Sequence, residues 1–301
     1  MLRWRLIVAA TILIPLCSLV YVDYNWPLDA QRGGTWLLIV LAVAATLACG
    51  EIIELLRRDD IAPRPMAVYG GVLLILGLTC VPLFFADYPA DCPVGKTGWP
   101  LLGFACSVFW VFLVEMRFFQ QTANGKAVMN VGMGVFAVAY VGLLMSFLAL
   151  LRFYHSNQWG MMALVSMMFV VKVSDSGAYA IGRMAGKHPI APVLSPKKTW
   201  EGAVGGLIAG CLSSWAFFAW FVPTVIPDAK VNVIGALVYG LLLTLAAMVG
   251  DLAESMLKRD ANQKDSSRWM VGLGGVLDIL DSILAASPVA FLCWAGGLVG
   301  P

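Results

Sequence analysis

The chain has 301 residues, of which 60% are hydrophobic and 13% are charged, and its mean hydropathy is +0.83. A chain of this composition has too few polar side chains to cover a water-soluble globule, so a soluble enzyme or binding domain is excluded. The formal net charge is +2, and we expect the partner to be a lipid bilayer and not a nucleic acid. The sequence therefore indicates an integral membrane protein.

Long apolar runs fill most of the chain. A bilayer core about 30 Å thick is crossed by a helix of about 20 mainly apolar residues. We predict an all-α fold, a polytopic membrane bundle of about nine transmembrane helices. The first run follows Arg3 and Arg5 and lacks a clear small-residue cleavage site before Asp23, so we interpret it as a retained span and not as a signal peptide. In chain order the runs lie near residues 5–22, 33–50, 66–86, 98–119, 128–151, 158–181, 201–226, 231–256 and 275–297.

The seven cysteines are odd in number, scattered and mostly inside these runs. They show neither a CxxC pair nor metal-ligand spacing, so we interpret them as small membrane-buried side chains. Cys80 and Cys92 form the one pair that could meet, at one edge of the membrane.

Lysine and arginine concentrate in the cytoplasmic loops of membrane proteins, so their distribution over alternate loops predicts the orientation. With nine spans, one set of loops carries fifteen of the 20 Lys and Arg residues and the other set carries four, while Lys172 lies inside a span. The N-terminus and the two long connections near residues 182–200 and 257–274 are therefore predicted to be cytosolic, and the C-terminus is predicted to lie outside. We expect the active site on the cytosolic side.

Several acids fall inside the apolar runs, where ionisable groups usually face a partner, a cavity or a substrate path. Asp251, Glu254 and Lys258 share one face of the eighth span, and Asp278 and Asp281 share a face near the start of the ninth. Because these spans are consecutive and antiparallel, Asp251, Asp278 and Asp281 are predicted to converge. Close carboxylates repel unless a cation lies between them, and an oxygen-rich cluster suits Mg²⁺. We predict a metal site at these three acids, with room for a second cation.

Ion pairing is the alternative explanation for the other intramembrane charges. Lys172 is three residues before Asp175, and Glu254 is four residues before Lys258. Both spacings bring side chains together on a helix. The sequence leaves this interpretation open for both pairs.

The connection before the seventh span ends in SPKKTWEG, residues 195–202. Ser195 is expected to act as the N-cap and Pro196 as the first-turn residue, so that the helix begins with Lys197 and Lys198. The N–H groups and the positive dipole end of a helix favour an anion there, and two lysines strengthen that preference. The alternative is that these lysines obey the positive-inside rule or contact anionic lipid headgroups.

The two cytosolic connections together supply carboxylates for a metal, bases for phosphates and a glycine-rich segment before Asp278. These groups are typical of phosphoryl or nucleotidyl transfer, in which positioning and charge neutralisation supply most of the catalysis. Because the groups lie at the membrane face, we expect an acceptor with a lipid tail.

The segments SPKKTWEG and SMLKRDANQKD, followed by Asp278, closely resemble the CDP-diacylglycerol synthases, also called phosphatidate cytidylyltransferases. The resemblance covers roughly residues 160–290, and the earlier spans agree only in being hydrophobic. It implies a helical membrane enzyme that uses Mg²⁺ to convert CTP and phosphatidic acid to CDP-diacylglycerol and pyrophosphate for phospholipid synthesis. The matched positions are Asp175, Ala178, Tyr179, Gly182, Gly186, Lys187, residues 195–202, Gly250, Asp251, Glu254, Ser255, Lys258, Arg259, Lys264, Asp265, Gly274, Gly275, Asp278, Asp281 and Ser282.

The resemblance also implies roles for these residues. Asp251 and Asp278 would bind the metal, with Asp281 in support. No protein nucleophile is needed, because a phosphatidate oxygen attacks the α-phosphorus of CTP. The implied location is a bacterial inner membrane, and a homodimer is left open. The bases implied to bind phosphates are Lys197, Lys198, Lys258, Arg259 and Lys264, and the further substrate-binding candidates are Ser195, Thr199, Asp175, Tyr179, Glu254 and Asp265.

Two positions depart from the family pattern. Leu273 stands where the family usually has His before the paired glycines, and Ile279 stands where Arg usually follows the first Asp of the closing motif. These losses leave open a weakened enzyme, another lipid phosphate as substrate, or an inactive relative, and a transporter is a more distant alternative. We favour an active enzyme, because each carboxylate of the predicted metal site is present. Residues 1–155 are expected to form scaffold spans and residues 156–301 the catalytic core of one compact membrane domain.

Overall fold

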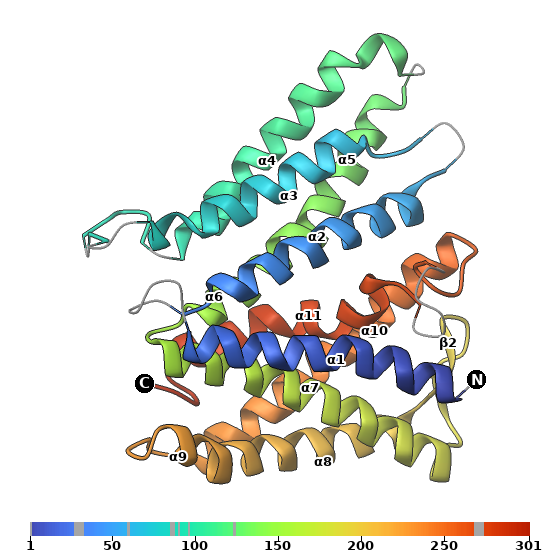
Figure 1. The fold of residues 1–301 in the computed structure, drawn as a ribbon. Helices are drawn as coiled ribbons and strands as arrows, with labels where there is room; N and C mark the ends of the chain where they lie inside the picture. Colours follow the sequence, from blue (N-terminus) through green and yellow to red (C-terminus); the bar gives the residue numbers. More distant parts are fainter. Residues whose placement is uncertain are drawn as a thin grey trace. The chain divides into compact units, whose positions relative to one another are not determined.

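The computed structural model describes residues 2–26, 33–58, 61–84, 88–89, 91–95, 97–122, 125–267 and 274–301, with the side chains of residues 2–13 left aside. Long helices dominate the described part, as Figure 1 shows. The elements up to residue 152 are α1 (Leu2–Asn25), α2 (Thr35–Leu56), α3 (Pro65–Thr79), η1 (Val81–Leu83), α4 (Gly98–Arg117), η2 (Phe119–Gln121), α5 (Ala127–Ala137), η3 (Val138–Leu143) and α6 (Leu144–Arg152). The later elements are α7 (Asn157–Ala185), β1 (Pro189–Ala191), β2 (Ser195–Thr199), α8 (Trp200–Ala216), η4 (Phe217–Phe221), α9 (Val222–Val225), α10 (Val233–Asp260) and α11 (Val276–Ala295).

Eight helical segments of the described part are long and apolar enough to cross a membrane, and each coincides with a predicted run. The prediction of a polytopic helical membrane bundle is therefore confirmed. The first predicted run, residues 5–22, lies within the 24-residue helix α1. The side chains of residues 2–13 lie outside the described part, so the role of α1 as a ninth span stays a prediction.

Two of the spans contain a π-helical turn. The span Ala127–Arg152 consists of α5, η3 and α6, and the span Trp200–Val225 consists of α8, η4 and α9. A π-turn inserts a residue into a helix without ending it. Each predicted run therefore remains one continuous helical segment.

The first compact unit comprises Met1–Leu150 and Asp260–Ile279. Within it, α3 and α4 approach closely, because Gly71 and Gly103 place no side chain between them. A Cβ on Gly103 would lie 2.9 Å from the Cα of Ile75, and Ser107 Oγ donates to the carbonyl oxygen of Gly71 over 2.7 Å. Small residues at helix interfaces and hydroxyl-to-backbone hydrogen bonds are typical of membrane bundles.

A buried acid, Glu115, ties three elements of the first unit together. Its Oε1 accepts hydrogen bonds from Thr122 Oγ1 over 2.8 Å and from Asn130 Nδ2 over 3.0 Å. Arg64 Nε lies 3.5 Å from Glu115 Oε2. Because a buried charge is costly unless it is paired and hydrogen-bonded, this network explains Glu115 as a structural residue.

The second compact unit comprises Leu151–Arg259 and Leu280–Pro301. Helix α7 packs along α8, and glycines set the crossings of α8 with α10 and of α10 with α11. A Cβ on Gly240 would lie 2.5 Å from the carbonyl oxygen of Gly210, and a Cβ on Gly250 would lie 2.7 Å from that of Asp281. These distances are below any real Cβ contact, so the helices approach as closely as their backbones allow.

The segment SPKKTWEG begins as a strand and not as a helix. Strand β2 pairs antiparallel with β1, and α8 begins only at Trp200. The N-cap of α8 is Thr199, whose Oγ1 accepts a hydrogen bond from the N–H of Gly202 over 3.2 Å. The prediction that Ser195 caps this helix is therefore wrong.

The two lysines of this segment consequently lie in β2 and not in the first helical turn. A serine followed by proline suits a helix start, but proline is also tolerated at the edge of a sheet. Residues 195–199 form a strand because they pair with residues 189–191. Local capping preferences contain no information about this pairing. The expected helix-terminal anion site at Lys197 and Lys198 is therefore replaced by a basic β-hairpin.

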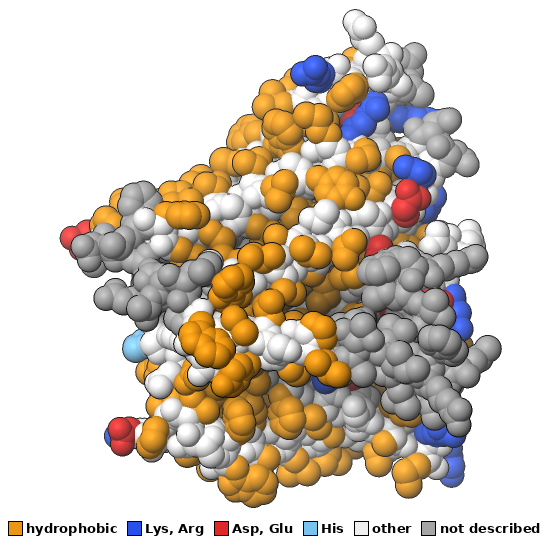
Figure 2. Space-filling view, in the orientation of Figure 1, with side chains coloured by type: hydrophobic (Ala, Val, Ile, Leu, Met, Phe, Trp, Pro, Cys, Tyr) orange, Lys and Arg blue, Asp and Glu red, His pale blue; other side chains and the backbone are white. Residues whose placement is uncertain are grey.

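The surface agrees with a membrane location. Figure 2 shows hydrophobic side chains along the lengths of the helices, with Lys and Arg mainly near helix ends. Exposed large apolar residues include Phe109 and Phe112 in α4 and Ile208 and Leu212 in α8. Lipid tails can cover such side chains without the cost of exposing them to water.

Candidate active site

An ion pair joins the basic hairpin to the acidic face of α10. Lys198 Nζ lies 2.6 Å from Asp251 Oδ2. The Lys198 nitrogen is itself buried, whereas the side chain of Asp251 is 36% exposed. The pair therefore places the partly exposed carboxylate of Asp251 beside the buried ammonium group of Lys198.

Two further acids of the second unit surround this pair. Asp175 of α7 and Asp281 of α11 each interact electrostatically with Asp251. Lys172 Nζ lies 4.0 Å from Asp175 Oδ2, and Lys198 also acts electrostatically on Asp175. The three acids and two lysines of this unit therefore influence one another's charge. Carboxylates that are close enough to repel one another favour a bound cation.

Glu254 and Lys258 form a separate, buried ion pair. Lys258 Nζ donates to Glu254 Oε2 over 2.6 Å, and the side chain of Glu254 is 0% exposed. The pairing left open by the sequence is therefore observed. Its burial gives Glu254 a structural role, because a substrate does not reach a fully covered carboxylate.

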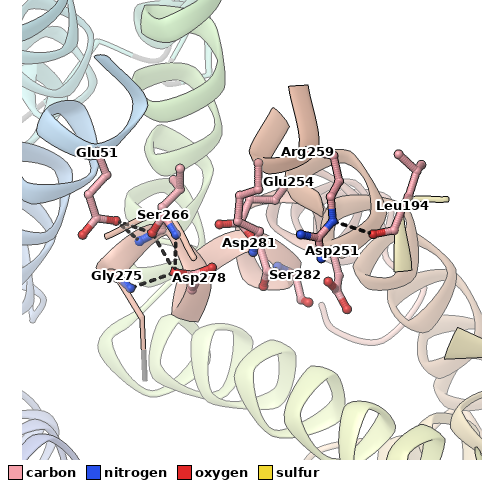
Figure 3. Close-up of polar contacts among 12 residues, drawn as sticks. Glu51, Leu194, Asp251, Glu254, Arg259, Ser266, Gly275, Asp278, Asp281 and Ser282 are labelled. Carbon is pink, nitrogen blue, oxygen red and sulfur yellow. Dashed lines mark hydrogen bonds and ion pairs between the residues drawn. The ribbon is translucent and has the colours of Figure 1, made fainter. Parts of the chain in front are cut away.

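The remaining predicted phosphate-binding bases lie on the hairpin and beyond the end of α10. Lys197 is exposed on β2, and Lys264 and Asp265 are exposed after α10. Arg259 is exposed in the last turn of α10, and its Nε donates to the carbonyl oxygen of Leu194 over 3.2 Å (Figure 3). That hydrogen bond fastens the tip of the hairpin to α10 within the second unit.

The hairpin is also held by Glu201, which sequence reasoning did not single out. Glu201 Oε2 accepts hydrogen bonds from the backbone N–H of Lys187 and of His188, over 3.1 and 3.3 Å. Its Oε1 lies 2.6 Å from His188 Nδ1. Glu201 follows the hairpin and its partners Lys187 and His188 precede it, so these contacts join the two ends of the hairpin. The signal for this role was the acid of KKTWEG in the first turn of α8.

Tyr179, a predicted substrate-binding residue, is 67% exposed. It lies on α7, one turn after Asp175, and its hydroxyl accepts a hydrogen bond from Arg183 Nη1 over 3.2 Å. Ser195, by contrast, is half-buried at the start of β2. Tyr179 and Lys197 are thus exposed in this unit, and Asp251 is partly exposed.

Asp278 belongs to the first unit and closes the first turn of α11. Its Oδ2 accepts hydrogen bonds from the N–H of Gly275 over 2.8 Å, and from the N–H and Oγ of Ser266, both over 2.8 Å (Figure 3). An acid at the third helical position that accepts from the N-cap N–H is half of a capping box. Cation binding by Asp278 would therefore rely on its other oxygen, Oδ1.

The same turn contacts Glu51 of α2, a residue that sequence reasoning missed. Glu51 is 6% exposed and accepts hydrogen bonds from Val276, Leu277 and Ser266. The predicted span ended at residue 50, one residue before Glu51, whereas α2 continues to Leu56. Had the predicted span extended to Leu56, Glu51 would have been recognised as an acid inside the membrane that needs a partner.

In the part of the chain that the structure describes, no group of three or more His, Cys, Asp or Glu side chains is arranged to hold a metal ion. Magnesium usually takes one or two protein carboxylates and completes its shell with water and phosphate oxygens, so a ready-made cage is not required. Of the two positions that depart from the family pattern, Ile279 lies in the first turn of α11. Leu273, like Arg268, falls outside the described residues.

The fold and the charged groups together define a polytopic membrane protein with acids and bases suited to phosphate chemistry. Residues 5–295 match the model of the Cytidylyltransferase family, and the chain belongs to this family. It is accordingly a nucleotidyltransferase.

Curated relatives show the same likeness, two of them over most of the chain and one over about half of it. A phosphatidate cytidylyltransferase of Mycobacterium bovis is 32% identical over 297 residues, which are 97% of this chain and 87% of the relative. One of Staphylococcus aureus is 29% identical over 258 residues, covering 86% of this chain and 89% of the relative. One of Haemophilus influenzae is 39% identical over 141 residues, covering 47% of this chain and 48% of the relative.

Proposed function

We propose that the protein transfers a cytidylyl group from CTP to phosphatidic acid, giving CDP-diacylglycerol and pyrophosphate. The observation that carries the proposal is the sequence identity of 32%, over 97% of the chain, to a phosphatidate cytidylyltransferase. The exposed carboxylate of Asp251, paired with Lys198, supports it from the structure. A membrane-embedded enzyme also suits an acceptor whose acyl chains stay in the bilayer.

In the proposed reaction an oxygen of the phosphatidate phosphate attacks the α-phosphorus of CTP. A new P–O bond forms there, the bond to the β-phosphate oxygen breaks, and pyrophosphate leaves with that electron pair. Both reacting groups are phosphates, so the protein's task is to align them and to offset their negative charge. Lys197 and Lys198 of the hairpin and Arg259 and Lys264 near the end of α10 are the bases proposed for this task.

We further propose that Mg²⁺ binds at Asp251 and Asp281, with Asp278 as the third candidate from the family resemblance. Asp175, Asp251 and Asp281 act electrostatically on one another and supply only oxygen donors, which fits a hard divalent cation. When bound, the ion would offset charge on the phosphates. Lys198 is paired with Asp251, and we propose that this lysine also offsets charge on a phosphate bound beside that acid.

The direct test is an assay of the purified, folded protein with CTP, Mg²⁺ and phosphatidic acid in detergent or vesicles. We expect CDP-diacylglycerol and pyrophosphate to form in equal amounts, and we expect chelation of the metal to stop the reaction. Substituting ATP for CTP is the nucleotide control, and a polyprenyl phosphate in place of phosphatidic acid is the acceptor control. Absence of turnover with phosphatidic acid from well-folded protein would contradict the proposal.

The proposed location is the inner membrane of a bacterium, with the hairpin and the loop after α10 in the cytosol. The relatives named above are bacterial, and CTP is a cytosolic metabolite. The distribution of Lys and Arg over alternate loops supports the same orientation.

A further inference from the structure

Glu51 is a carboxylate inside an apolar helix that crosses the membrane. It lies in α2 and is 6% exposed. A charge in such a place is costly unless several donors surround it. The contacts of Glu51 therefore indicate why the residue is there.

The Glu51 carboxylate accepts hydrogen bonds from backbone N–H groups at the start of α11. In Figure 3 the carboxylate points toward this end of the helix. Its Oε1 accepts from the N–H of Val276 over 2.9 Å, and its Oε2 accepts from the N–H of Leu277 over 2.7 Å. These are the first two residues of α11, whose N–H groups have no partner within the helix. An anion at this end is also favoured by the helix dipole.

A single hydroxyl connects Glu51 to Asp278. Ser266 Oγ lies 2.9 Å from Glu51 Oε2 and 2.8 Å from Asp278 Oδ2. Asp278 in turn accepts from the N–H of Gly275. The two carboxylates thus hold the same helical turn from two sides, one from α2 and one from within α11.

The paired glycines before α11 make room for these carboxylates. A Cβ on Gly275 would lie 2.3 and 2.4 Å from the two Glu51 oxygens and 2.1 Å from Ser266 Oγ. Gly274 has a φ of +82°, and a Cβ there would lie 2.3 Å from Asp278 Oδ2. Close approach of the acids therefore explains both glycines, in addition to the backbone freedom that Gly274 needs.

We propose that Glu51 is a positioning residue for the nucleotidyl transfer, acting through the first turn of α11 on the carboxylate of Asp278. The inference rests on the proposed function, since it assigns Asp278 to the reaction. It gives helix α2 a part in positioning Asp278, in addition to its role as a scaffold. Groups that orient a metal ligand commonly change activity or metal affinity by about 10–100-fold when they are removed.

The test compares Glu51→Gln with Glu54→Gln, two substitutions of the same chemistry on the same helix. Gln offers one acceptor oxygen, and its NH₂ group faces a donor, whereas Glu51 serves three donors. Glu54 is a suitable control because its side chain is 58% exposed and pairs along the helix with Arg57. We expect E51Q to lower kcat and to raise the Mg²⁺ concentration for half-maximal rate, each by about tenfold or more. E54Q should stay within about twofold of the wild type, as expected for a surface site.

Hydrogen exchange provides a readout that does not depend on turnover. In E51Q the amides of Val276 and Leu277 should exchange faster, while those in the middle of α11 should keep their protection. Ser266→Ala is a second variant that introduces no buried charge, and it should raise the Mg²⁺ requirement by a smaller factor than E51Q does.

The outcomes separate the two proposals. An inactive but folded wild-type protein contradicts the proposed function. An active wild type together with an E51Q variant that has the same kcat, Mg²⁺ requirement and exchange pattern overturns the inference about Glu51. If E51Q does not fold, Ser266→Ala becomes the test. An unchanged Mg²⁺ requirement in Ser266→Ala then overturns the inference about Glu51.

Discussion

At the scale of single residues, two acids one turn apart on α10 have opposite surroundings. The Asp251 side chain is 36% exposed beside Lys198, and Glu254 is fully buried against Lys258. Their spacing placed both on one helical face, and the structure separates their roles. The exposed acid is available to a cation or a substrate, whereas the buried pair contributes to stability.

We expect Asp251→Asn to abolish Mg²⁺-dependent turnover, with a loss of at least about 100-fold, because the amide keeps the shape but not the charge. Its thermal unfolding temperature should fall by less than that of Glu254→Gln, because the Lys198–Asp251 pair is partly exposed, at 26% and 36%, whereas the Lys258–Glu254 pair is 12% and 0% exposed. We expect Glu254→Gln to lower stability more than it lowers turnover. It leaves Lys258 in a buried site without its anion, which costs about 3–5 kcal/mol of stability. Rates and thermal unfolding in the same detergent measure both effects, and near-normal turnover of D251N would remove Asp251 from the metal site.

At the scale of elements, close helix packing in both units depends on glycine at particular crossings. Helices α8 and α10 meet where Gly210 faces Gly240, and the two backbones leave no space for a side chain. Without a hydrophobic driving force between helices in lipid, such close van der Waals contact is a main source of association. The basic hairpin extends directly from the start of α8, so this packing also supports Lys198.

Gly240→Ala should therefore be strongly destabilising, because its new methyl group would lie 2.5 Å from the carbonyl oxygen of Gly210. The matched control is Gly77→Ala in α3, where a Cβ would meet nothing within 4 Å. That change should be neutral or stabilising by up to about 1 kcal/mol, since alanine favours a helix more than glycine does. Melting temperatures of the two variants in detergent provide the comparison. Equal destabilisation by both would show that backbone contact at Gly240 is not the cause.

At the scale of the whole molecule, the charge distribution predicts the membrane orientation. Fifteen of the 20 Lys and Arg residues fall on one set of loops, which includes the hairpin and the segment after α10. The positive-inside rule predicts that this set lies in the cytosol. That orientation would give cytosolic CTP access to the hairpin and to the segment after α10.

Cysteine labelling tests this orientation in intact cells. In a background whose native cysteines are replaced, a membrane-impermeant thiol reagent applied outside should miss Val193→Cys in the hairpin and Gln263→Cys after α10. Asp228→Cys, in the exposed turn before α10, should react. All three should react after the membrane is opened. Labelling of either cytosolic position in intact cells would reverse the topology.

The sequence by itself determined the membrane class, eight of the nine predicted spans, which recur in the described part of the structure, and the family. Hydropathy is a local property of about 20 residues, so each span can be recognised without its neighbours. The family motifs are likewise contiguous, as SPKKTWEG and SMLKRDANQKD show. The clustering of Asp251 with Asp281 was also predictable, because consecutive spans are antiparallel and return to the same face of the membrane.

Only the tertiary structure decided how the charged groups are used. Ser195 has a local environment typical of a helix cap, and its strand pairing depends on residues across the hairpin. Glu254 and Asp251 share a pattern and differ only in burial. Glu51 and Leu277 are separated by 226 residues and meet through a side chain and a backbone N–H. No local period records such a contact, because it exists only once helices distant in sequence have packed together and a buried carboxylate has to find its donors there.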